Sequence, residues 1–174
     1  MEVHDLLGDA FSRIHDAAHA AVDGLSAEHI VARPDAEANT IAWLVWHLTR
    51  VQDHHVSELA GRPQVWTTGD WSGRFGTDPD PDNTGYAHTA TQVAGVVPDR
   101  VEDLLEYFDE VHHETLEYVE TLTPDALDRI VDRSWDPPVT AGVRLISVIN
   151  DTMQHAGQAN YLRGLIEQGL GSGG

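Results

Sequence analysis

Apolar side chains recur every three or four positions in four long stretches of the chain, which is the period of an amphipathic helix. These stretches cover about residues 4–24, 40–60, 98–122 and 140–168. No stretch shows useful β-alternation, and no internal repeat is visible. The pattern therefore predicts an all-α protein, an antiparallel four-helix bundle formed by a single domain of residues 1–168.

A long internal segment and the C-terminal end are the parts outside this helical pattern that bear most on the fold. Residues 64–90 lose the period and form a long loop between the second and third helices, and such loops are usually functional or disordered. Trp66, Trp71 and Phe75 argue against disorder, because aromatic rings need a surface to pack on. We expect this loop to lie across one end of the bundle, where it either lines a pocket or only covers the core. Residues 169–174 are expected to form a flexible tail.

The charge of the chain excludes several classes of partner. Its 174 residues contain 10 basic and 29 acidic side chains, a formal net charge of −19. This charge repels nucleic acid and anionic membrane surfaces. No apolar run approaches the ~20 residues of a membrane span, and no signal peptide is visible at the start. We therefore expect a soluble, cytoplasmic protein that binds neither nucleic acid nor membranes.

Two residue types are missing, and each absence removes a type of chemistry. Every basic residue other than histidine is arginine, so a catalytic lysine and its Schiff-base chemistry are excluded. The chain has no cysteine, which removes disulfides, thiolate nucleophiles and thiolate metal ligands. Any metal ion must therefore be held by histidine, aspartate or glutamate.

A polar row interrupts the apolar stripe of the last helix. Asp151, His155 and Gln158 stand at positions i, i+4 and i+7, so their side chains point the same way. Alone, Asp151 and His155 fit an ordinary exposed pair, but a third ligand from another helix would complete a metal site. His47 is the best candidate because it lies in the most apolar helical run, where a buried imidazole needs a partner.

Other polar residues are weaker candidates for the site. Asp53 and His54 are reserve ligands or candidates for a general base. Arg50 and Arg163 are candidates to hold a carboxylate of a ligand, with surface ion pairs as the alternative. Gln158 would orient a metal ligand or a water molecule. Histidine pairs elsewhere fit solvated or flanking faces of their helices: His15 and His19, and His112 and His113.

Two stretches carry a family resemblance. The chain resembles the DinB-like (YfiT-like) bundle superfamily, and most closely its branch of mycothiol-dependent maleylpyruvate isomerase and related thiol-dependent transferases. The resemblance rests on Asn39-Thr40-Ile41-Ala42-Trp43-Leu44-Val45-Trp46-His47-Leu48-Thr49-Arg50 and on Asp151-x-x-x-His155-x-Gly157-Gln158-x-x-Tyr161-Leu162-Arg163-Gly164. It implies a divalent metal, commonly zinc, with nickel, iron or manganese as alternatives, held by His47, Asp151 and His155. Many members have histidine, and the isomerase glutamate, where this chain has Asp151.

Three protein ligands leave a coordination position open, as in catalytic rather than structural zinc sites. Because the chain has no cysteine, a thiolate would come from a small cosubstrate, and the resemblance implies a mycothiol-like thiol that attacks a small-molecule electrophile. This predicts a metal-dependent thiol transferase or isomerase. A hydrolase that uses metal-bound water is one alternative. A non-enzymatic metal- or ligand-binding bundle, forming a homodimer through one bundle face, is the other.

Overall fold

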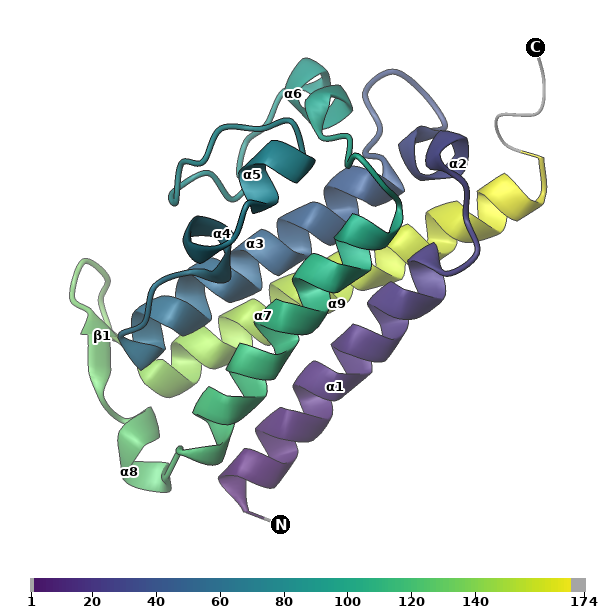
Figure 1. Ribbon diagram of the computed structural model, residues 1–174. Coiled ribbons are helices and arrows are strands. Elements are labelled where there is room, and N and C mark those ends of the chain that lie inside the picture. The colour runs from purple at the N-terminus through teal and green to yellow at the C-terminus, as the bar shows by residue number, and fades with distance from the viewer. Residues whose placement is uncertain (1, 170–174) are drawn as a thin grey trace.

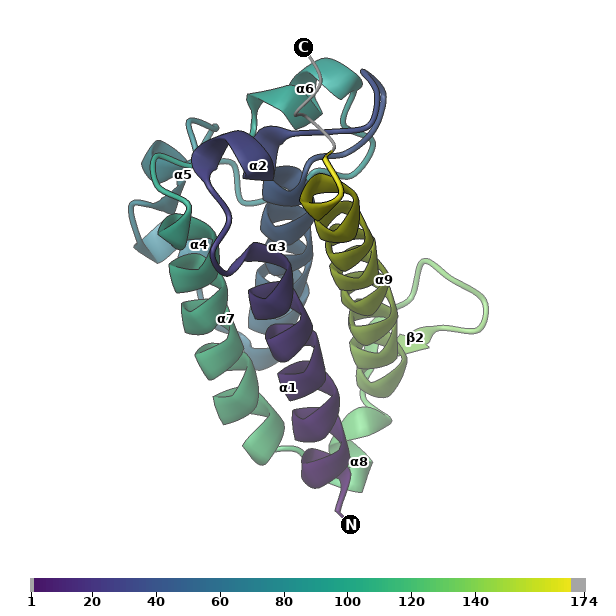
Figure 2. The same ribbon diagram turned by 90° about the vertical axis from the view of Figure 1, so that its right-hand side faces the viewer.

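The computed structural model describes residues 2–169 and is mostly helical, which confirms the all-α prediction. Most of the predicted tail, residues 170–174, lies outside the described part. Four long helices lie side by side (Figures 1 and 2): α1 (Val3–Val22), α3 (Ile41–Ala60), α7 (Glu102–Glu120) and α9 (Ala141–Glu167). Helices α1 and α3 each pack against both α7 and α9, so the four long helices enclose the core.

The long helices do not alternate in direction along the chain, which differs from the simple antiparallel arrangement expected from the sequence. Helix α1 runs antiparallel to α7, and α3 runs antiparallel to α9, but α3 and α7 point the same way (Figure 1). The reason is the connection of residues 61–101, which carries the chain back along the molecule so that α7 starts at the end where α3 starts.

Local signals in the sequence set the ends of the helices that carry the candidate ligands. The Thr40 hydroxyl accepts a hydrogen bond from the Trp43 N–H at 3.0 Å and so caps the start of α3. Gly61 ends that helix with a φ of 67°, a left-handed conformation that glycine adopts without strain. Thr140 caps α9 in the same way through the Val143 N–H.

The structure adds short elements between the long helices. They are α2 (Ala27–Val31), α4 (Val65–Thr68), α5 (Trp71–Arg74), α6 (Ala90–Gly95), α8 (Pro124–Leu127) and an antiparallel hairpin of β1 (Ile130–Asp132) and β2 (Val139–Thr140). Apart from the turn of α8, which its Thr-Pro start indicates, these elements are too short for a period to reveal them. Among helices of residues 2–169, none is long and apolar enough to cross a membrane.

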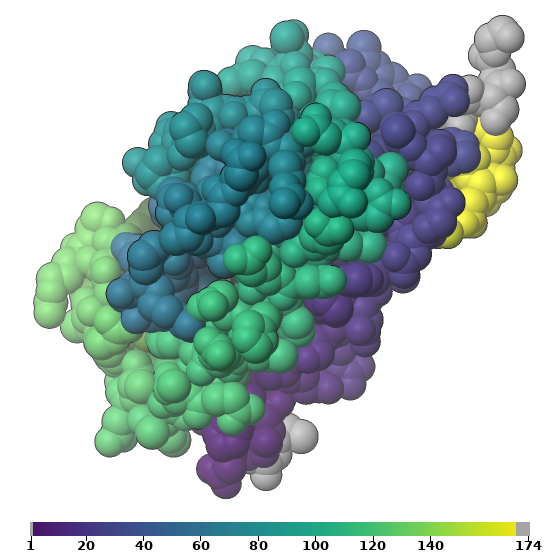
Figure 3. All heavy atoms as spheres, in the orientation of Figure 1, coloured from purple at the N-terminus to yellow at the C-terminus, as the bar shows by residue number. Residues whose placement is uncertain are grey.

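The connection between α3 and α7 packs on the long helices rather than extending into solvent. Trp66, Trp71 and Phe75 are buried and join a core cluster with Tyr107 of α7. Figure 3 shows this connection, in blue and teal, spread over one side of the molecule. The aromatic residues of the connection thus pack on the bundle, as the sequence predicts.

Candidate metal centre

His47 lies in the second turn of α3 with 6% of its surface exposed. Its Nδ1 is 2.5 Å from the backbone carbonyl of Thr84, in the long connection. Because a carbonyl oxygen only accepts, Nδ1 carries the hydrogen and Nε2 of the neutral ring keeps its lone pair. That Nε2 faces Oδ2 of Asp151 on α9, at 3.8 Å. The fold thus presents His47 in the form that binds a metal.

Asp151 and His155 stand one turn apart on α9 and face His47. The Nε2 atom of His155 is 3.8 Å from Oδ1 of Asp151, and its Nδ1 is 2.9 Å from Oε1 of Gln158. The hydrogen bond to this amide oxygen again places the hydrogen on Nδ1 and leaves Nε2 free. One ligand atom from each of His47, Asp151 and His155 lies within 4.8 Å of the other two.

The carboxylate of Asp151 fits a bound cation. Its Oδ2 is buried and has no hydrogen-bond partner within residues 2–169, and both imidazole contacts, at 3.8 Å, are too long for hydrogen bonds. Two imidazoles and one carboxylate are a usual ligand set for zinc and other divalent first-row metals. The structure therefore brings together the three predicted ligands in an arrangement that fits such an ion.

Electrostatics also favour the neutral, metal-binding form of His47. Burial lowers the pKa of this imidazole below its ordinary value of 6.5, and nearby His155 lowers it further. The hydrogen bond to Thr84 and the charge of Asp151 act in the opposite direction but do not outweigh burial. At neutral pH the ring is therefore uncharged and needs to lose no proton to bind a metal.

A close backbone approach holds the connection against His47. Gly85 has a φ of 89°, and a Cβ at this position would lie 2.8 Å from the Trp46 ring and 3.1 Å from Nδ1 of His47. Glycine is thus required both by conformation and by space. On the ring's face, Trp43 stacks on His47 with centroids 4.6 Å apart and planes 8° from parallel. The imidazole is fixed by packing as well as by Thr84.

A pocket of about 430 Å³ opens beside the three ligands. Its walls come from α3, α9 and the connection, and they include His47, Val51, His54, His55, Asp82, Thr84, Tyr86, Arg144, Ser147, Val148 and Asp151. Arg144 is the one arginine in this wall, and its guanidinium contacts Nδ1 of His55 at 3.4 Å and Asp132 at 3.2 Å. The volume is in the range of small-molecule sites.

His54 and His55 differ in their surroundings. His54 lines the pocket, and its Nδ1 lies near the Pro81 carbonyl at 3.2 Å and the Gln64 side chain at 3.1 Å. Burial lowers the pKa of His55 to about 4, and the charges of Arg144 and His54 act in the same direction. His55 is therefore a neutral wall of the pocket at physiological pH.

Arg50 does not reach the pocket with a free donor. It is fully buried, and it donates to the carbonyls of Pro81 at 2.8 Å and Asn83 at 3.1 Å, and to Oε1 of Gln64 at 2.9 Å. Its guanidinium also lies over the Trp66 ring. These contacts tie the connection to α3, so the sequence-based expectation that Arg50 holds a ligand carboxylate has no geometric support.

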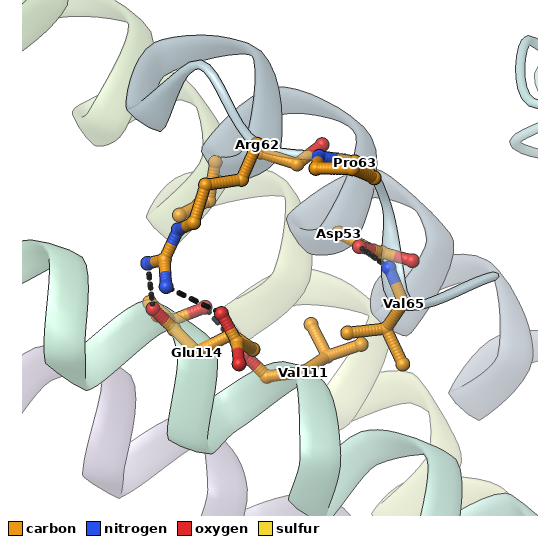
Figure 4. A pocket seen from close by; sticks show the side chains of 9 residues that line it. Asp53, Arg62, Pro63, Val65, Val111 and Glu114 are labelled. Carbon is orange, nitrogen blue, oxygen red and sulfur yellow. Dashed lines mark hydrogen bonds and ion pairs between the residues drawn. The ribbon is translucent and has the colours of Figure 1, made fainter. Parts of the chain in front are cut away.

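Asp53 is likewise a structural residue in this arrangement. Its carboxylate, 3% exposed, accepts hydrogen bonds from the Val65 and Trp66 N–H groups, each at 2.9 Å, and from the Tyr107 hydroxyl at 2.8 Å. Figure 4 shows it beside a small cavity whose lining includes the Arg62–Glu114 ion pair. The cavity holds only about 20 Å³, about one water molecule, so Asp53 has no access to substrate there.

Arg163 also lies away from the three ligands. It donates to the carbonyls of Ala20 and Asp23 at the end of α1, at 2.9 and 2.7 Å, and pairs with Glu167. A cation at this position satisfies the free carbonyls of a helix C-terminus. Gln158, in contrast, contacts His155 as expected for a residue that orients a ligand.

Three residues of the site, Thr84, Gly85 and Arg144, were not predicted from the sequence. Arg144 had a usable signal, because it precedes Asp151 by two helical turns and so shares its face. Thr84 and Gly85 had none, because they act through a backbone carbonyl and a missing side chain in a segment without periodicity.

The fold and these side chains define an all-α protein with a candidate three-ligand metal centre beside a pocket. A family model described as mycothiol-S-transferase matches residues 6–168, so the chain belongs to this DinB-like family, as its motifs predict. The crystal structure of a conserved protein from Enterococcus faecalis is similar, with 28% identity, coverage of 97% of this chain and 99% of that one, and a TM-score of 0.88. No curated protein sequence matches the chain.

Proposed function

We propose that this protein is a divalent-metal-dependent transferase or isomerase that joins a low-molecular-weight thiol of the mycothiol type to a small electrophile. The observation that carries the proposal is the Asp151 carboxylate: its buried Oδ2 has no hydrogen-bond partner among residues 2–169, and the Nε2 atoms of His47 and His155 face its Oδ2 and Oδ1, respectively. Membership of the mycothiol-S-transferase family supports a thiol as the cosubstrate.

Each residue of the centre has a defined task in this proposal. His47, Asp151 and His155 would hold the ion, most simply zinc, with nickel, iron or manganese as alternatives. Thr84 and Gln158 keep the two imidazoles in the metal-binding tautomer. When bound, the ion lowers the pKa of a coordinated thiol and so supplies a thiolate at neutral pH. The thiol must come from a cosubstrate, since the chain has no cysteine.

The pocket wall indicates how substrates are oriented. Arg144 faces the pocket with a side chain 21% exposed, and it is positioned by Asp132 and His55. It can donate to a carboxylate or hydroxyl of either substrate. Tyr86 offers an exposed ring at the rim, suited to cover an apolar group. Arg144 thus takes the ligand-holding task that the sequence suggested for Arg50 and Arg163.

The test combines metal analysis with turnover. Untagged protein is expected to bind about one equivalent of zinc at the centre and to consume mycothiol in the presence of a suitable electrophile from a panel. His47→Ala and Asp151→Asn should lose both the zinc of this centre and turnover while their circular dichroism stays native. Arg163→Gln is the matched control and should keep both. Zinc-loaded protein that neither binds nor consumes any thiol would overturn the proposal.

One alternative keeps the same metal and uses water instead of thiol. His54 favours it, because this imidazole lines the pocket near the candidate ligands and can act as a general base. The same panel assayed without thiol decides between them. Turnover without thiol that is lost in His54→Gln would replace the transferase by a hydrolase.

The non-enzymatic alternative, a dimeric binding module, rests on the surface of α9. Val143, Ile146 and Met153 are exposed there and can form an apolar face between two copies. Sedimentation of the wild type beside Ile146→Glu tests the dimer. A dimer that binds zinc but turns over nothing would favour this alternative.

A further inference from the structure

A second group of metal-binding side chains lies between α1 and α7. His15 and His19 stand one turn apart on α1, and their Nε2 atoms are 2.8 and 2.7 Å from the same oxygen, Oδ1 of Asp109 on α7. One ligand atom from each of the three residues lies within 4.8 Å of the others. The sequence suggested only a solvated face for the two histidines, because it gave no sign that Asp109 stands opposite them.

The hydrogen-bond pattern of this group is unfavourable without a cation. When both rings are neutral, each contact with Asp109 requires a hydrogen on Nε2, which leaves both Nδ1 lone pairs bare. Yet Nδ1 of His15 lies 3.8 Å from the Asp16 carboxylate, and Nδ1 of His19 lies 4.0 Å from that of Asp23. Each bare nitrogen therefore faces a negative oxygen.

A metal ion removes this conflict. A ring that binds an ion through Nε2 carries its hydrogen on Nδ1, where it faces the carboxylate of Asp16 or Asp23 favourably. Histidine ligands in metalloproteins commonly present their second nitrogen to a carboxylate in this way. We propose that His15, His19 and Asp109 form a second divalent-metal site, suited to zinc or a similar transition metal, that clips α1 to α7.

The packing around His15 supports a built site rather than a chance encounter. The His112 ring stacks on His15 with centroids 4.4 Å apart and planes at 23°, and the centroid of the Phe108 ring is 5.6 Å from that of His15. The His15 and His19 side chains are only 25% and 27% exposed. The His15 ring is thus packed against α7, and both rings remain partly open to solvent, which leaves an entry path for an ion.

The second site repeats the plan of the first on the opposite side of the molecule. Each antiparallel pair of long helices contributes two ligands four residues apart from one helix and one ligand from the other. The α1–α7 pair lies across the core from the α3–α9 pair, and the pocket beside His47 is lined by none of the three residues. A structural clip, not a second reaction centre, is the role that this position supports.

The test begins with the variant His47→Ala/His155→Ala, which lacks the first site, so its outcome is independent of the proposed function. This full-length, untagged protein is expected to retain one equivalent of zinc by elemental analysis and to give the visible absorption of cobalt bound by nitrogen and oxygen. Zinc should raise its melting temperature by about 5–10 °C at a free concentration about 100 times the dissociation constant.

Adding His19→Ala or the near-isosteric Asp109→Asn to that variant should abolish the zinc, the cobalt spectrum and the thermal shift. His113→Ala is the matched control, because His113 lies on α7, as Asp109 does, but its side chain is 72% exposed and outside the cluster. Circular dichroism verifies that each variant is folded. A folded parent variant that binds no zinc, or zinc binding that survives both His19→Ala and Asp109→Asn, would refute the second site.

Discussion

At the scale of single residues, the candidate centre depends on hydrogen bonds made by Nδ1 of His47 and Nδ1 of His155, the ring nitrogens that do not face Asp151. The backbone of Thr84 orients His47, and the side chain of Gln158 holds Nδ1 of His155. We expect Gln158→Leu to weaken zinc binding about 10–100-fold, because such orienting partners commonly contribute that much. Competition with a chromophoric chelator measures the change.

The neighbouring glutamine provides the control for that substitution. Gln154 is also exposed on α9, but its side-chain amide donates to the carbonyl of Asn150 in its own helix and not to a candidate ligand. Gln154→Leu should therefore leave zinc affinity unchanged. Equal affinities for the two variants would show that Gln158 does not orient His155.

A second residue-scale prediction concerns Gly85, where the connection meets His47. Gly85→Ala introduces a Cβ 2.8 Å from Trp46 at a φ of 89°, so the loop must move and Thr84 loses its position. We expect the free energy of unfolding to fall by about 1–3 kcal/mol and zinc affinity to fall with it. Urea unfolding and the chelator assay measure the two effects.

Gly157 on α9 provides the control for Gly85→Ala, because a side chain is tolerated there. Outside the adjoining backbone of its own helix, no atom of residues 2–169 lies within 4 Å of a Cβ placed there, and the residue is in mid-helix. Gly157→Ala should raise the free energy of unfolding by roughly 0.5–1 kcal/mol through lower backbone entropy of the unfolded chain. A Gly85→Ala protein as stable as Gly157→Ala would mean that the loop does not need its close approach to His47.

At the scale of elements, Arg50 and Asp53 attach the connection to α3. Arg50→Met removes three hydrogen bonds to that segment and leaves the Asp53 carboxylate buried without its ion pair. We expect unfolding free energy to fall by about 3–5 kcal/mol. If Arg50 instead held a ligand, the variant would keep its stability in urea and raise only KM.

Arg13, an exposed arginine, provides the control for Arg50→Met. Its replacement removes a positive charge without breaking a buried ion pair. Arg13 pairs with Asp9 one turn away on α1, where both side chains are largely exposed. Arg13→Met should change stability little, because exposed pairs contribute little. A similar loss in both variants would contradict the structural role of Arg50.

The sequence carries enough information for the helices and for the three candidate ligands. Period, caps such as Thr40 and stops such as Gly61 are local signals, and the row of Asp151, His155 and Gln158 is visible within one helix. The parts that the sequence did not reveal depend on contacts between distant segments. The sequence around an arginine in an apolar helix, such as Arg50, is the same whether the side chain binds a ligand or a loop.

At the scale of the whole molecule, the directions of the helices also cannot be predicted from local sequence patterns. Helix periodicity shows which face is buried but not which way a helix runs, and the connection of residues 61–101 is long enough to permit either direction for α7. The packed aromatic residues of this connection fix the parallel arrangement of α3 and α7. That arrangement in turn creates the two antiparallel pairs, α1–α7 and α3–α9, on which both ligand groups are built.

Stability of the whole molecule should depend on the protonation of His55. Burial, with Arg144 and His54, lowers the pKa of this imidazole to about 4, against 6.5 when exposed. Between these values the unfolded chain binds a proton that the folded protein does not. The contribution of His55 is therefore fully present above pH 6.5, is lost as pH falls toward 4 and changes no further below that.

Replacing His55 tests this expectation in the metal-free protein, so that release of an ion does not contribute. In EDTA, His55→Asn should reduce the slope of unfolding free energy against pH by up to about 1.4 kcal/mol per pH unit between pH 6.5 and 4. His113→Asn is the control, because that side chain is 72% exposed whereas His55 is 27% exposed. Urea unfolding at four pH values measures both slopes. Parallel curves for the two variants would show that His55 takes up its proton equally well in the folded and unfolded chains, and so that the pocket wall does not exclude water from this ring.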